Sequence, residues 1–301
     1  MIDTSVEICG VHMKNPVTVA SGTFGSGIEY DEFFDVSKLG AVTTKGVAII
    51  PWAGNPTPRI AEVYGGMMNA VGLQNPGVEE FIRTDLAFLQ KKDARVIVNV
   101  CGHSEEDYIK CVERLRDCDN IDLLEINVSC PNVKQGGITF GTDPKALEKI
   151  TSEVKKVARQ PIIMKLTPNV TNIADMARAA AAGGADAISL INTLTGMKID
   201  INRRCFAVAN RTGGVSGPAI KPIAVRMVYD VCHAVDLPVI GMGGIQTAED
   251  AIEFIMAGAT MVSVGTATFH DPLAALKVVN GIEAFMEKNG IKNLDEIRKC
   301  L

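Results

Sequence analysis

The sequence predicts a (β/α)8 barrel, on the evidence of eight short apolar segments, the amphipathic helical segments between them, and the polar residues at their ends. A short apolar run bounded by turn residues is typical of a strand that is buried on both faces. Eight alternating units favour a closed barrel over a doubly wound sheet. The expected strands are 17–20, 41–44, 96–100, 123–127, 162–166, 187–191, 239–241 and 261–264.

Helices are expected where apolar residues recur with a period near 3.6 between these strands. The connections after the second and sixth strands are the longest and are rich in Gly, Pro and Asn, so we expect elaborated loops over one face of the barrel. No shift in composition marks a second domain, and we expect residues 1–301 to form one barrel domain. The clearest helical segments are 105–116, 144–158, 173–182, 248–256 and 272–286.

Composition narrows the function classes. A hydrophobic content of 47% in 301 residues allows a large core. The formal net charge of -5 disfavours a nucleic-acid partner. The N-terminus has no export signal and no apolar run could span a bilayer, so we expect a soluble chain with reduced thiols in the cytosol. The eight cysteines form no C-x-x-C pair and the four histidines show no ligand spacing, so neither an iron–sulfur cluster nor a metal site is expected in this chain.

Polar residues gather at the carboxyl ends of the expected strands, where barrels of this kind carry their chemistry. An unpaired amide or ammonium group costs several kcal/mol in an apolar core. Each of these residues alone could be a satisfied structural group, but together they outline a site. They are Ser21, Thr44, Lys45, Asn99, Asn127, Lys165, Asn192, Thr193, Gly243, Gly244, Gly265 and Thr266.

The segment 127–132 places a thiol just beyond the fourth strand. Pro131 cannot donate to a sheet ladder, so the backbone leaves the sheet there and Cys130 lies on a loop with a rigid support. Cys130 is either a reactive thiol or a small buried apolar residue, and the segment alone does not decide between them.

Two strand ends indicate a phosphate site. Residues 241–245 lead into a helix start and Gly265–Thr266 end the last strand, so backbone N–H groups of both strands can converge on one anion. Glycines also serve close packing of helix against strand, which is the alternative. Residues 213–218 of the long sixth connection offer further N–H groups toward the same region, or form a plain turn.

Lys45 and Lys165 are both expected to point into the barrel mouth. A lysine there can bind a ligand anion or an electron-rich ring atom, or serve as a Schiff-base amine. Glu125 lies two residues before Asn127 and therefore on the same strand face, which makes it a candidate buried partner for one of the lysines.

These motifs, taken in order, resemble those of the class 1 dihydroorotate dehydrogenases over nearly the whole chain. The cysteine at position 130 separates class 1 from the membrane-associated class 2, which carries serine as the base. Residues 21–25, 44–46 and 192–197 resemble subtype B, the NAD-linked form, more than the fumarate-using subtype A. The matching motifs are 20–25, 44–46, 69–77, 127–132, 165–168, 192–193, 217–220 and 241–245.

The resemblance implies oxidation of dihydroorotate to orotate in pyrimidine biosynthesis. It implies that Cys130 is the general base at C5 of the substrate while hydride passes from C6 to N5 of FMN. The implied substrate-binding residues are Lys45, Asn69, Val71, Gly72, Leu73, Asn127, Asn192 and Thr193. The implied FMN-binding residues are Ala20, Ser21, Thr44, Lys45, Asn99, Asn127, Lys165, Ile191, Gly217, Gly243, Gly244, Gly265 and Thr266.

The resemblance also implies a partner subunit with FAD and a [2Fe–2S] cluster, through which electrons reach NAD. This chain has neither the cysteine spacing for the cluster nor a G-x-G-x-x-G loop after a strand, which agrees with that expectation. The implied assembly is a heterotetramer, with a homodimer of this chain and two partner subunits, and with no nucleic acid or membrane bound.

Four alternatives stay open at this stage. A pyrimidine reductase half like that of dihydropyrimidine dehydrogenase shares the barrel and a cysteine. A tRNA-dihydrouridine synthase is a flavin barrel too, but favours Gly where this chain has Ser129, and the acidic balance and residues 69–77 oppose it. A Schiff-base aldolase using Lys165 and a non-catalytic phosphate-binding barrel are more remote.

Overall fold

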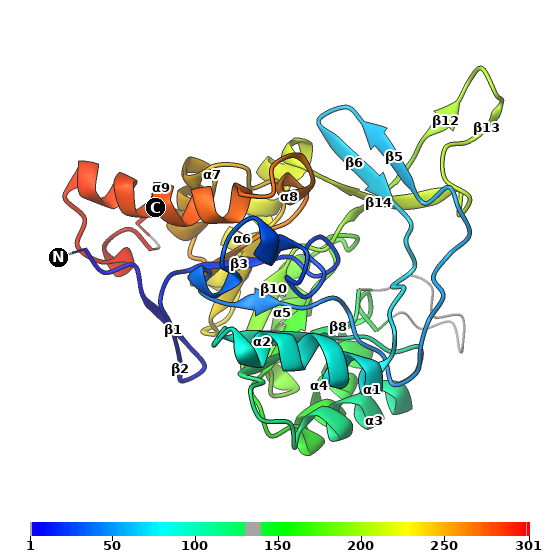
Figure 1. Cartoon of the computed structure of the whole chain (residues 1–301), viewed down its shortest axis with the longest axis horizontal. Coiled ribbons are helices and arrows are strands. Elements are labelled where there is room, and N and C mark those ends of the chain that lie inside the picture. Colours follow the sequence, from blue (N-terminus) through cyan, green and yellow to red (C-terminus); the bar gives the residue numbers. More distant parts are fainter. Residues whose placement is uncertain (1, 130–139, 299) are drawn as a thin grey trace.

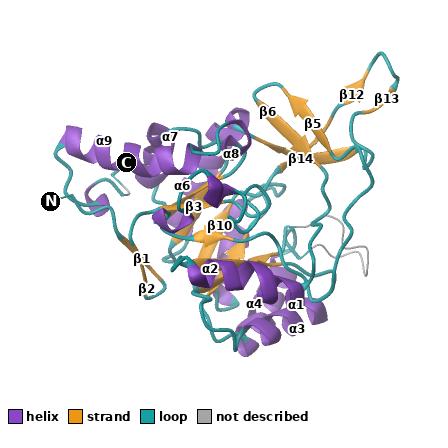
Figure 2. Cartoon of the chain, in the orientation of Figure 1, coloured by secondary structure: helices purple, strands orange, loops and turns teal. Residues whose placement is uncertain are grey.

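The computed structural model describes residues 2–129, 140–298 and 300–301 and contains a nearly closed barrel of eight parallel strands (Figures 1 and 2). All eight expected strands are confirmed. In spatial order they are β3 (Val17–Val19), β16 (Met261–Val264), β15 (Val239–Met242), β10 (Ala187–Leu190), β9 (Ile162–Lys165), β8 (Leu123–Asn127), β7 (Val96–Val100) and β4 (Val42–Thr43).

The barrel closes between its first and last strands, β3 and β4. The backbone N–H of Gly40, just before β4, donates to the carbonyl of Val17 at 2.9 Å. Inside the barrel the Thr18 and Thr43 hydroxyls are hydrogen-bonded at 2.9 Å. Every residue of these eight strands is buried, because helices cover the outer face and side chains from opposite strands fill the interior.

Helices surround the barrel, and four of the described α-helices begin at side-chain caps. Ser104, Asp143, Asn172 and Thr247 each accept a hydrogen bond from a backbone N–H in the first turn of the helix that follows. The five expected helices are confirmed, with the last one shifted toward the C-terminus. The helices are α3 (Glu105–Leu115), α4 (Pro144–Val157), α5 (Ile173–Ala182), α6 (Lys221–Ala234), α7 (Ala248–Met256), α8 (Ala267–His270) and α9 (Ala274–Asn289).

The helix expected over 272–286 begins two residues later, at Ala274, because the Asp271 carboxylate accepts a hydrogen bond from the Leu273 N–H and holds the chain in a turn. It ends at Asn289, and the next residue is Gly290, whose φ of 68° is readily reached by glycine. The remaining helical pieces are α1 (Val78–Phe81), the π-helical η3 (Ile82–Leu86) and α2 (Ala87–Lys91), with short 3-10 turns η1 (Tyr30–Glu32), η2 (Val36–Lys38), η4 (Pro218–Ile220) and η5 (Leu294–Glu296).

The two longest connections form a second sheet beside the barrel mouth. We expected loops there, but four strands pair in the order β11 (Leu194–Met197), β14 (Thr212–Ser216), β6 (Gly66–Asn69) and β5 (Ile60–Val63). Residues 213–216, expected in a loop or turn, belong to β14. In Figure 1 this sheet stands apart from the barrel, and the hairpin of β12 (Ile199–Asp200) and β13 (Cys205–Phe206) projects beyond it.

A hairpin near the N-terminus, β1 (Val6–Ile8) and β2 (Val11–Met13), packs at the opposite end of the barrel. Ile8 and Met13 are buried, and the Cys9 thiol donates to the carbonyl of Asp186, the residue before β10. The hairpin therefore covers the amino ends of the strands and leaves their carboxyl ends free for a site. Among the residues described, no helix combines the length and the apolar character needed to cross a membrane.

Candidate functional site

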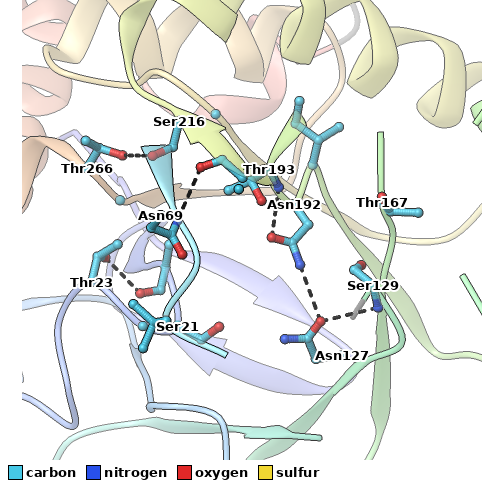
Figure 3. Close-up of a pocket in the computed structure, with 18 of the residues that line it drawn as sticks. Ser21, Thr23, Asn69, Asn127, Ser129, Thr167, Asn192, Thr193, Ser216 and Thr266 are labelled. Atoms are coloured by element: carbon cyan, nitrogen blue, oxygen red, sulfur yellow. Dashed lines mark hydrogen bonds between the residues drawn. The ribbon is translucent and has the colours of Figure 1, made fainter. Parts of the chain in front are cut away.

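A cavity of about 480 Å³ lies at the carboxyl ends of the barrel strands, between the barrel and the four-stranded sheet (Figure 3). Its volume falls within the range of about 300–1,000 Å³ that is common for small-molecule sites. Asn69 of β6 and Gly213 and Gly214 of β14 face the strand ends across it. The site is therefore built from both the barrel and the added sheet.

Most residues that the motifs single out line this cavity. Thr44 and Asn99 do not; both are fully buried behind the wall, where the Asn99 N–H donates to the Thr44 hydroxyl at 3.3 Å. The expected residues that line it are Ala20, Ser21, Lys45, Asn69, Val71, Gly72, Leu73, Asn127, Lys165, Ile191, Asn192, Thr193, Gly217, Gly243, Gly244, Gly265 and Thr266.

Cys130, the expected base, lies outside the described residues, as do Pro131 and Asn132. The described chain on both sides of this segment lines the cavity, through Ser129 before it and Gly141 after it. Ser129 is held there by its hydroxyl, which donates to the carbonyl of Lys165 at 2.9 Å.

One end of the cavity suits an anion. Gly244, Gly265 and Thr266 line it, and their backbone N–H groups donate to no residue in the described part of the chain. Gly243 and Gly244 have φ values of 127° and 87°, which residues other than glycine rarely adopt. The Thr266 hydroxyl donates to that of Ser216 at 2.8 Å and ties β14 to this end of the barrel. Free N–H groups that converge at strand ends can bind a phosphate.

The Ser263 hydroxyl is an orphaned polar group in the cavity wall. It belongs to β16, only 2% of the residue is exposed, and its oxygen has no hydrogen-bond partner among the described residues. A buried hydroxyl without a partner is costly. Because Ser263 lies on the cavity lining, a ligand bound there could supply the missing partner.

Lys45 supplies an uncompensated cation at the cavity wall. Its ammonium group lines the cavity and forms no hydrogen bond or carboxylate ion pair with any residue that the structure describes. Burial lowers the pKa of Lys45, and the charge of Lys165 lowers it further, while the Cys101 thiol acts in the opposite direction. A buried ammonium without a counter-ion is stabilised by an anionic ligand.

Lys165 is buried too, but it is paired. Its Nζ lies 3.2 Å from Glu125 Oε1 and donates to the Ser21 hydroxyl at 3.3 Å. Glu125 also accepts from Asn99 Nδ2 at 2.6 Å and from the Ser189 hydroxyl at 2.7 Å. The expectation that Glu125 is a buried partner of one of the lysines is therefore confirmed, and that lysine is Lys165.

The amides of Asn127 and Asn192 lie side by side at the cavity wall. Asn192 Nδ2 donates to Asn127 Oδ1 at 3.4 Å, and Asn127 Oδ1 also accepts from the Ser129 N–H at 3.4 Å (Figure 3). Asn192 Oδ1 accepts from the Thr193 N–H at 2.8 Å. Asn127 Nδ2 donates to Asn99 Oδ1 at 3.5 Å, so each of the two amides has one N–H left to offer a ligand, which favours a substrate with oxygen acceptors.

Ser263 and Ser189 were not predicted as site residues, although the pattern of their strands marks them. Each is the single polar residue in a short apolar strand, 261–264 and 187–190. In a buried strand such a residue needs a partner, either inside the protein or in a ligand. Ser216 and Phe269, which also line the cavity, carry no such signal.

Comparison with known proteins identifies the family of the chain. The model of the family described as dihydroorotate dehydrogenase matches residues 3–286. A protein of Lachnoclostridium phytofermentans named dihydroorotate dehydrogenase B (NAD(+)), catalytic subunit, is 64% identical over 300 residues, which cover all of both chains. Proteins of the same name from Alkaliphilus metalliredigens and Alkaliphilus oremlandii are 61% and 62% identical, over 100% and 97% of this chain and 99% and 96% of their own.

The family match spans the barrel together with the connections that build the second sheet, so it includes every described residue of the cavity wall. Identity above 60% over whole chains extends the match to both ends of the sequence. The chain therefore belongs to the dihydroorotate dehydrogenase family, as the motifs at its strand ends indicate.

Proposed function

We propose that this chain is the catalytic subunit that oxidises dihydroorotate to orotate in pyrimidine biosynthesis, with FMN as its bound cofactor and residues 1–301 as one FMN-binding domain. The observation that carries the proposal is the division of the cavity. One end offers free backbone N–H groups for a phosphate, and the rest offers an unpaired ammonium group and amide donors for an acidic, oxygen-rich ring.

The residues of the cavity fit FMN. Gly243, Gly244, Gly265 and Thr266 would hold its phosphate, with Gly217 beside them. The remaining cofactor contacts would come from Ser263, whose hydroxyl lacks a partner, and from the wall that bears Ala20, Ser21, Lys45, Asn127, Lys165 and Ile191. Thr44 and Asn99 would act from behind this wall. When bound, FMN supplies the acceptor for the hydride that leaves C6 of the substrate.

The substrate would lie in the same cavity, in the part away from the phosphate end. Lys45 would bind its carboxylate, because that ammonium group forms no hydrogen bond or ion pair with a described residue and lines the cavity. Asn127, Asn192 and Asn69 would orient the ring through their N–H groups, with Thr193 and the segment 71–73 at its edge. Holding a flat substrate in one orientation supplies much of the catalysis in such reactions.

Cys130 would remove the proton from C5. This assignment rests on the motif 127–132 and on the two flanking residues, Ser129 and Gly141, which both line the cavity. Loss of a proton from C5 and a hydride from C6 converts the single bond between them into the double bond of orotate. The thiolate is the basic form of cysteine, so the step needs deprotonated Cys130.

A second subunit would carry the electrons onward to NAD. The relatives are named catalytic subunits of NAD(+)-linked enzymes, and that wording implies another subunit. FAD and a [2Fe–2S] cluster would belong to that subunit, and two copies of each chain would form the heterotetramer.

Anaerobic mixing with dihydroorotate tests the function. We expect the flavin absorbance to bleach in the FMN-loaded wild type. In Cys130→Ala the protein should remain yellow, while bleaching slows by roughly 10²–10⁴-fold, as expected for loss of a general base. Wild-type protein that binds FMN but shows no bleaching would refute the function. Bleaching at the wild-type rate in Cys130→Ala would refute only the assignment of the base.

Electron transfer to NAD tests the partner. After reduction by dihydroorotate, this chain alone should leave added NAD unreduced, and adding the partner subunit should start NADH formation. NADH formed at the same rate without any partner would show that the second subunit is not required.

Lys45 makes orotate binding depend on pH. Because burial lowers its pKa, Lys45 should lose its proton at a pH below the ordinary lysine value of about 10.4. Only the protonated form attracts the carboxylate, so orotate affinity should fall as pH rises through that lowered pKa. The measurement is orotate titration from about pH 7 to 10 in Cys130→Ala, which removes the thiol titration from the same range.

Lys45→Met should bind orotate about tenfold more weakly at pH 7 and lose this pH dependence. An unchanged affinity would exclude Lys45 as the carboxylate site.

Gly244→Ala tests the phosphate end, with Gly290→Ala as its matched control. Both glycines have positive φ, but Gly290 lies at the end of α9 with open space around it, whereas a Cβ at Gly244 would lie 2.9 Å from the Gly217 carbonyl oxygen. Each substitution should lower the free energy of unfolding by about 1 kcal/mol or more. Only Gly244→Ala should also weaken FMN binding, by about tenfold or more. Equal FMN affinity in both variants would place the phosphate elsewhere.

A further inference from the structure

We infer that Glu125 is a positioning residue that divides the work of the two cavity lysines: by neutralising Lys165 it reserves that lysine for the uncharged ring of FMN and leaves Lys45 as the site for the substrate carboxylate. This inference rests on the proposed function. Glu125 touches neither ligand, because it does not line the cavity and acts only through the side chains that contact it.

The Glu125 carboxylate lies at the centre of a buried network. Only 2% of the residue is exposed, and its two oxygens accept three hydrogen bonds, from Asn99, Lys165 and Ser189. These donors stand on β7, β9 and β10, the strands around β8. The carboxylate is thus held by side chains on three strands, and an exchange of partners would leave at least one buried group unpaired.

The ammonium group of Lys165 has three N–H donors, and the described chain uses two of them. Glu125 Oε1 accepts one at 3.2 Å and the Ser21 hydroxyl accepts another at 3.3 Å. Lys165 also lines the cavity. One N–H is therefore left for a ligand atom, and Glu125 and Ser21 together fix the direction in which it points.

The two lysines differ in whether a neighbouring carboxylate balances their positive charge. Lys165 and Glu125 form a pair of net charge zero, so a ligand meets Lys165 as a hydrogen-bond donor beside its own counter-ion. Lys45 forms no ion pair with a carboxylate of the described chain, and its pKa is lowered first by burial and then by the charge of Lys165, against the opposite effect of the Cys101 thiol. An anionic carboxylate is attracted more strongly by the uncompensated charge. Without Glu125 both lysines would attract it, and the substrate would have two competing positions.

The reduction potential of bound FMN reports the charge of this pair directly. Reduction adds electrons to the flavin, so an unpaired Lys165 should favour the reduced form. In Glu125→Gln we expect the potential to rise by about 30 mV, which is tenfold in the equilibrium constant of a two-electron couple. In Ser189→Ala, which removes one hydrogen bond from Glu125 but no charge, we expect no shift.

The double variant shows whether Glu125 acts through Lys165. Lys165→Met should lower the potential. In that background the buried Glu125 carboxylate has lost its counter-ion and takes up a proton, so adding Glu125→Gln replaces one neutral group by another and should change the potential no further. Removing both members of a buried ion pair is often tolerated even where removing one is not, so this comparison stands if Glu125→Gln alone does not fold. A shift caused by Glu125→Gln in the Met background would overturn the inference, because Glu125 would then act on the flavin by itself.

Orotate binding supplies a second, independent readout. Glu125→Gln should lower the dependence of orotate affinity on Lys45, so that Lys45→Met costs less in the Gln background than in the wild type. An equal cost in both backgrounds would contradict the division between the lysines. Wild-type protein that binds no FMN, or that binds it without bleaching by dihydroorotate, would refute the proposed function. Normal bleaching with unshifted potentials would refute this inference alone.

Discussion

The buried ion pair between Lys165 and Glu125 is the interaction on which the site depends. Two charges removed from water are stable only where their remaining hydrogen bonds are satisfied. Here Asn99 of β7 and Ser189 of β10 donate to the Glu125 carboxylate, and Ser21, in the loop after β3, accepts from Lys165, which keeps one N–H for a ligand. The pair therefore fixes the relative positions of the strand ends from which a ligand would be held.

The barrel and the added sheet have separate roles. The strands of the barrel are buried along their whole length, so the only places for polar side chains that face a ligand are at their ends. The four-stranded sheet lies over those ends and closes the cavity with Asn69 and the glycines of β14. Asn69 Nδ2 donates to the carbonyl of Gly214 at 3.4 Å, which links the two halves of that sheet at the cavity itself.

Much of the barrel could be predicted, because a buried strand is a continuous apolar run with a polar end. The second sheet could not, for a physical reason. β5 and β6 follow the second barrel strand while β11 and β14 follow the sixth, and none of them has the apolar pattern of a buried strand. In β14 the glycines are required by space, since a Cβ at Gly214 would overlap the Thr193 hydroxyl oxygen. Nothing local distinguishes such glycines from those of a turn.

Within the site, residue types were predictable and their arrangement was not. Lys45 and Lys165 look equivalent in the sequence, and only the structure shows that Glu125 pairs with one and leaves the other. Asn99 and Thr44 stand at strand ends like the lining residues, yet they lie behind the wall, because a side chain at a strand end can face either the cavity or its support.

The central claim is that the two lysines bind different groups. It is tested most directly by a crystal structure of this chain with FMN and orotate bound. The account predicts the orotate carboxylate at Lys45 Nζ, the free N–H of Lys165 directed at the FMN ring, and the FMN phosphate against Gly244 and Gly265. An orotate carboxylate bound to Lys165, or FMN seated away from these glycines, would contradict it.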